Sequence, residues 1–120
     1  MGLEEKRGNP SACLEDMQAS CEAILIYTAG FTAEDFSNDL KTIDAVLRRL
    51  EVLGEAAGRL LRLAEQAGSA YAGLPLRTAY DMRNALIHGY DGVDVGVVWQ
   101  TVTRDIPPLL EAISAELIRR

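Results

Sequence analysis

The densest group of chemically active side chains lies between residues 81 and 90, where the chain reads Asp-Met-Arg-Asn-Ala-Leu-Ile-His-Gly-Tyr. The segment contains Arg83, Asn84, Tyr90 and His88, the single histidine of the chain. A guanidinium carries a permanent charge on a planar fork that fits two phosphate oxygens. An imidazole, whose ordinary pKa is about 6.5, exchanges protons near neutral pH. The segment could therefore bind an anionic group and move a proton beside it.

Each of these residues also has a structural interpretation when it is taken alone. Arg83 could form a surface ion pair with Asp81, and Asn84 could simply be solvated. His88 could be a cation at a helix C-terminus, and Tyr90 a buried ring that covers the end of a helical bundle. It is the combination of these types in one short segment that favours a functional site.

Helical spacing of apolar residues and capping signals predict four helices that must position this segment. We expect them at residues 10–29, at 32–68, which is a helix of about 35 residues, at 76–88, and from a cap at Asp94 to the C-terminus. No strand pattern is visible. The sequence therefore predicts an all-α fold, an antiparallel four-helix bundle with a long second helix and a C-terminal helix kinked at Pro107-Pro108.

Two glycines interrupt the long second helix. Gly54 and Gly58 each cost about 1 kcal/mol relative to alanine in a helix interior. Their spacing of four places both on one helix face, where close approach of another helix would compensate. A contact between two subunits is an alternative explanation of the same pair.

Length and composition indicate one domain. The chain has 120 residues, 48% of them hydrophobic and 25% charged, so we expect a single helical domain at 10–120 after a flexible tail at 1–9. The net charge of −6 disfavours nonspecific attraction of nucleic acid over the whole surface. A local basic stripe of Arg48, Arg59 and Arg62 is one alternative, and pairing of these residues with neighbouring glutamates is the other.

The remaining composition argues against cofactors and membranes. Cys13 and Cys21 lie about 12 Å apart on one predicted helix, beyond disulfide reach, so we expect reduced core thiols. Two cysteines and one histidine cannot form a usual zinc site, and we expect no metal and no cofactor. The chain has no apolar run of roughly 20 residues and no signal-peptide pattern, so we expect a cytoplasmic protein without a membrane span.

The segment Arg83-Asn84-Ala85-Leu86-Ile87-His88-Gly89-Tyr90 resembles the signature of the HEPN superfamily, and in particular its HepT-like toxin branch, which reads Arg-Asn-x-x-x-His-x-Tyr. Further similarity lies at residues 31–36, 54–56 and 97–99, so that the resemblance covers residues 12 to 113. One departure is Leu76-Arg77, where many relatives carry a tryptophan.

The resemblance implies a metal-independent endoribonuclease, the toxin of a type VII-like toxin-antitoxin pair of the HepT/MntA type. Cleavage would proceed by attack of the 2′-hydroxyl at the interface of a homodimer. Arg83 would bind phosphate and stabilise the transition state, Asn84 would orient the phosphate or the histidine, and His88 would transfer protons. Tyr90 would be adenylylated by a nucleotidyltransferase antitoxin, and the added AMP would repel RNA. The alternatives are a non-catalytic HEPN module that binds nucleotide or a partner, and a purely structural dimerisation subunit.

Helix geometry sets a condition on this site. Five residues at 100° each separate Arg83 and His88 by about 140° around a straight helix, whereas Asn84 and His88 share nearly one face. Either the helix ends before His88, or Arg83 reaches the histidine of the second subunit. We expect a mixture of both.

Overall fold

The computed structural model describes residues 9–67, 74–88 and 92–119, without the side chains of 66–67 and 85–88. The described part is all-helical and contains no strand, as predicted. The elements are α2 (Pro10–Tyr27), α3 (Ala33–Ser37), α4 (Leu40–Ala67), α5 (Leu76–His88), α6 (Val95–Gln100), the π-helical segment η1 (Thr101–Asp105) and α7 (Ile106–Ile118).

The first helix begins as the sequence predicts. The Asn9 side chain accepts hydrogen bonds from the backbone N–H groups of Ser11 and Ala12, and Pro10 occupies the first helical position. Cys13 and Cys21 are both buried and free, which confirms that they are core thiols. Burial and the nearby charge of Glu22 raise the pKa of the Cys21 thiol to about 12, so this thiol stays protonated at neutral pH.

The prediction of one helix over residues 32–68 is wrong, because the chain breaks at Asn38 and Asp39. Thr32 and Asp35 do form the expected capping box, but it opens only the short α3, which Asn38 ends. The Asp39 carboxylate then accepts a hydrogen bond from the Thr42 N–H, which lowers the pKa of Asp39 and starts α4. Asn and Asp side chains compete with helical hydrogen bonds in this way. The break leaves Leu40, the first residue of α4, 70% exposed.

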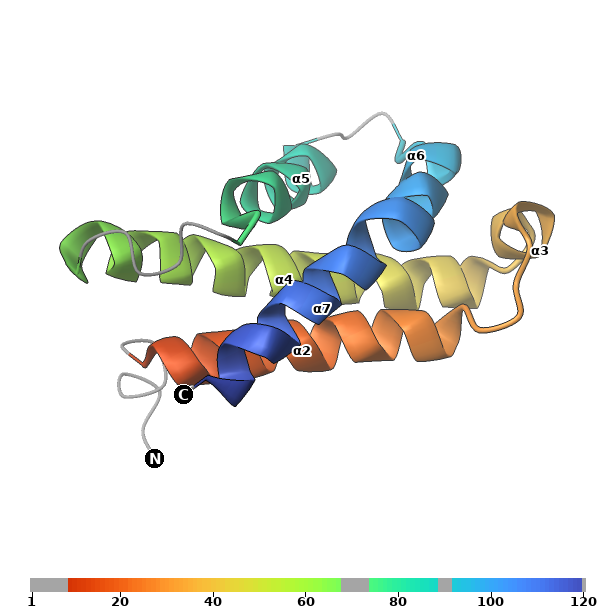
Figure 1. Cartoon of the computed structure of the whole chain (residues 1–120). Helices are drawn as coiled ribbons and strands as arrows, with labels where there is room; N and C mark the ends of the chain where they lie inside the picture. The colour runs from red at the N-terminus through yellow and green to blue at the C-terminus, as the bar shows by residue number, and fades with distance from the viewer. Residues whose placement is uncertain (1–8, 68–73, 89–91, 120) are drawn as a thin grey trace.

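One core holds the helices together. Helix α4 packs against α2 on one side and α5 on the other, and α7 packs against α2 (Figure 1). Helix α3 packs on α6, where the Phe36 and Trp99 rings lie 5.2 Å apart. Leucine, isoleucine and valine side chains from α2, α4, η1 and α7 fill the centre. The described helices are thus consistent with the predicted bundle.

The irregularity expected at Pro107-Pro108 is a π-helical segment. Residues 101–105 form η1, which Ile106 separates from the prolines, and the prolines lack the N–H groups that a regular helix would use. No described helix is both long enough and apolar enough to cross a membrane.

Candidate functional site

Helix α5 packs against α4 (Figure 1). Its approach is close because two glycines of α4 face it. A Cβ atom at position 54 would overlap the Arg83 Cβ and lie 2.8 Å from its Cγ and 2.9 Å from the Ala79 carbonyl oxygen. A Cβ atom at position 58 would lie 2.6 Å from the Tyr80 ring. The predicted close helix approach at Gly54 and Gly58 is therefore confirmed, and it is made within one chain. Both positions are buried, so they do not provide the surface contact that the structural-subunit alternative required.

The packing divides α5 into faces of different character. Leu76 and Ala79 are buried, and the stems of Tyr80 and Arg83 cover the α4 glycines. On the side of the helix centred about 120° from these four residues, Arg77 and Asp81 are exposed and Asn84 is half-buried. We call the positions 77, 81, 84 and 88 the open face of α5. At 100° per residue these positions lie within about 60° of one another.

Arg83 reaches this open face from the helix interface. Its aliphatic stem packs over Gly54, and its guanidinium Nη1 donates a hydrogen bond of 3.1 Å to the Asn84 Oδ1. Its Nε is buried without a hydrogen-bond partner in the described part of the chain, and no ion pair joins Arg83 to Asp81 or to another described residue. No carboxylate of the described residues thus neutralises the Arg83 charge, and Asn84 holds one edge of the guanidinium beside the open face.

Helix α5 includes His88 as its last residue, which confirms the predicted bounds 76–88 and rules out the alternative that the helix ends before His88. The backbone position of residue 88 falls one turn after Asn84 on the open face. The His88 side chain lies outside the described residues, and so does all of Tyr90. The structure therefore brings Arg83 and Asn84 together, while the placement of the other two predicted site residues stays a prediction.

Two of the three arginines of the alternative basic stripe on α4 are paired with carboxylates, whereas Arg62 is exposed and has no ion pair among the described residues. Arg48 forms an ion pair with Glu51 at 3.5 Å. Arg59 pairs with Glu55 at 3.2 Å and with Asp16 of α2 at 3.6 Å. These pairs favour the interpretation as a solvated face and an interhelical tie.

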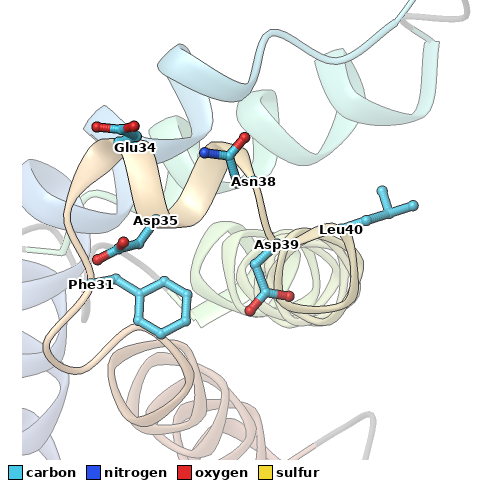
Figure 2. A pocket seen from close by; sticks show the side chains of 6 residues that line it. All are labelled: Phe31, Glu34, Asp35, Asn38, Asp39 and Leu40. Atoms are coloured by element: carbon cyan, nitrogen blue, oxygen red, sulfur yellow. The ribbon is translucent and has the colours of Figure 1, made fainter.

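Two hollows could not be predicted from the sequence, because residues of separate elements line each of them. One is an apolar groove of about 420 Å³ between α5 and the η1–α7 segment, lined by Pro75, Thr78, Ala79, Met82, Asp105, Ile106, Pro108, Leu109 and Ala112. The other, of about 540 Å³, lies where α3 meets α4, and Figure 2 shows the Asp35 and Asp39 carboxylates to either side of the Phe31 ring. No basic side chain lines the second hollow, so it repels phosphate. The described residues contain no cluster of three metal-ligating side chains.

Comparison of the sequence with known proteins identifies the family of this chain. The family model described as "Ribonuclease HepT-like" matches residues 17–116. The chain is 42% identical over 96 residues to a protein of Thermococcus cleftensis named "Probable ribonuclease HepT", covering 80% of this chain and 84% of that protein.

A second relative is similar to this chain over a comparable length. The chain is 32% identical over 100 residues to a protein of Caldanaerobacter subterraneus subsp. tengcongensis named "Putative RNase", covering 83% of this chain and 87% of that protein. No solved structure matches the chain. The match of the family model over most of the sequence, which includes the segment 83–90, shows that this chain belongs to the HepT-like ribonuclease family.

Proposed function

We propose that this chain is a metal-independent endoribonuclease whose site consists of Arg83, Asn84 and His88. The observation that carries the proposal is the Arg83 guanidinium, which has no ion pair among the described residues and is held by Asn84 at the open face of α5. Position 88 lies one helical turn further on the same face. A charge that a phosphate could neutralise is thus held by Asn84, one helical turn before the backbone position of the single histidine of the chain.

The chemistry that fits these groups uses the ribose 2′-hydroxyl as nucleophile. A base removes the 2′-hydroxyl proton, the oxygen attacks the adjacent phosphorus, and the P–O5′ bond breaks as an acid protonates the leaving oxygen. The products are a 2′,3′-cyclic phosphate and a 5′-hydroxyl. Arg83 stabilises the extra negative charge of the phosphorane, while Asn84 keeps the guanidinium in place.

The proton balance favours a homodimer. One imidazole cannot start the reaction both as the base and as the acid, whereas two copies of His88 at a two-fold interface supply one of each. The open face of α5 is suited to such an interface because its Arg83 and Asn84 groups would line a cleft shared with the second copy. We therefore propose RNA as the substrate and a second copy of the chain as the first partner.

The experiment that tests this function is RNA cleavage by the purified chain with excess EDTA. We expect cleavage in EDTA, with fragments that carry 2′,3′-cyclic phosphate and 5′-hydroxyl ends, detected by mass spectrometry. Binding of RNA without any cleavage would instead favour a non-catalytic module. Cleavage that stops in EDTA would contradict metal independence.

We further propose that the chain is the cytoplasmic toxin of a toxin-antitoxin pair, and that a nucleotidyltransferase antitoxin adenylylates Tyr90. AMP attached two residues after His88 would add a bulky anion beside the cleft and repel the RNA backbone. Incubation with ATP and the antitoxin should add one or more AMP masses to the wild-type chain and none to Tyr90→Phe. Full modification of Tyr90→Phe would disprove the assignment of Tyr90 and leave the roles of Arg83 and His88 unaffected.

A further inference from the structure

We propose that Arg77 binds an RNA phosphate flanking the cleavage point, and so extends the substrate path along the open face of α5. The inference rests on the proposed function, because it takes RNA as the ligand of this face. Nothing in the motif itself assigns a role to Arg77, which lies six residues before Arg83.

Arg77 lies in line with the candidate site along α5. Arg77 is the second residue of α5 and is exposed. It precedes Asn84 by seven residues and position 88 by eleven, so that all three lie within about 40° around the helix. At 1.5 Å per residue, Arg77 lies about 10 Å from Asn84 and about 16 Å from position 88 along the axis. It is thus aligned with the site but too far away to contact the reacting phosphate.

The Arg77 guanidinium carries a charge that no described carboxylate neutralises. Arg48, Arg59 and Arg119 are each paired with glutamate. Within the part of the chain that the structure describes, Arg77 has neither an ion pair nor a side-chain hydrogen bond. In a chain of net charge −6, an unpaired guanidinium on the face of the candidate site is the kind of group that attracts a nucleic acid backbone locally.

The groups near Arg77 on α5 also affect how strongly a phosphate binds there. It lies in the first turn of α5, where the backbone N–H groups add partial positive charge that favours a phosphate. The opposing group is Asp81, which is exposed on the same face one turn later and carries the wrong sign for RNA. Removing the charge of each residue should therefore change RNA affinity in opposite directions.

The test measures binding of an uncleavable 2′-O-methyl oligonucleotide, about ten nucleotides long, to the full chain as a function of salt. We expect Arg77→Ala to weaken binding about fivefold at low salt and to reduce the log–log salt slope by about 0.7, the loss of one phosphate contact on a single strand. Asp81→Asn should strengthen binding. On cleavable RNA, Arg77→Ala should raise KM with kcat within about twofold.

Arg48→Ala is the matched control. It removes the same charge from a side chain that is 67% exposed, on α4 and turned by about 120° from Gly54. We expect its RNA affinity and salt slope to match those of the wild type. Equal loss in Arg48→Ala and Arg77→Ala, no loss in Arg77→Ala, or no binding by the wild type would overturn the assignment of Arg77. Arg77-dependent binding without cleavage of ordinary RNA would contradict only the proposed catalytic function.

Discussion

Replacing His88 by alanine is expected to lower kcat for RNA cleavage by about 10²–10⁴, the usual contribution of general acid–base catalysis, with little change in KM. The reason is that 2′-hydroxyl attack needs one proton removed and one delivered, and His88 is the single histidine of the chain. Phosphate binding rests on Arg83 and Arg77, which the substitution leaves in place. Steady-state cleavage of a labelled oligonucleotide in EDTA measures both parameters.

The control for this prediction must show that the fold and the dimer persist. Position 88 ends α5, and alanine is a good helix former, so circular dichroism and the mass of the assembly should match those of the wild type. The wild-type kcat/KM should also fall on both sides of neutral pH, because a base and an acid titrate together as a pair. Cleavage by His88→Ala within tenfold of the wild-type rate would remove His88 from the mechanism.

A mixture of subunits tests whether Arg83 acts with the histidine of the other subunit alone. We consider dimers assembled from one Arg83→Ala subunit and one His88→Ala subunit. If both imidazoles are needed at each cleavage event, such mixed dimers stay inactive. If Arg83 acts with only the partner's histidine, one intact combination remains, and activity returns to about half of the wild-type level per dimer.

Much of the fold could be predicted from local signals. The cap at Asn9, the capping box at Thr32 and Asp35, and the bounds of α5 follow from side chains within a few residues of each helix end. The break at Asn38 and Asp39 was missed because the apolar spacing continues across it, although two side chains that favour caps stand there. Periodicity alone does not distinguish a continuous helix from two helices in similar register.

The candidate site was only partly predictable for a different reason. The types and spacing of Arg83, Asn84 and His88 indicated chemistry, but the helical wheel placed Arg83 away from His88. The direction of the guanidinium depends on two tertiary facts, the absence of a side chain at Gly54 and the hydrogen bond to Asn84. The exposure of an unpaired Arg77 also becomes visible only when the packing of α5 on α4 is known.

The second large effect is expected for Gly54→Ala. In an open helix this change stabilises by up to about 1 kcal/mol. Here the new Cβ would overlap the Arg83 Cβ and lie 2.9 Å from the Ala79 carbonyl oxygen. Neither atom is the free end of a flexible side chain, so α5 itself must move. Overpacking of this kind costs about 1–3 kcal/mol, and we expect thermal unfolding several degrees below that of the wild type.

The same displacement of α5 should also lower the catalytic rate, since Arg83, Asn84 and position 88 all lie on α5. A shift of about 1 Å in a catalytic group can cost 10²-fold in rate, and we expect kcat/KM of Gly54→Ala to fall by at least tenfold, well below its unfolding temperature.

Gly58→Ala is the matched control, because the three atoms nearest to its Cβ all belong to the Tyr80 ring. A ring can tilt without moving the helix backbone, so the stability loss should be comparable or smaller and the activity loss less than about threefold. If the two variants lose activity in proportion to their stability alone, then Gly54 supports the fold and does not position Arg83. A loss of activity specific to Gly54→Ala means that the close approach of the two helices sets the place of the guanidinium.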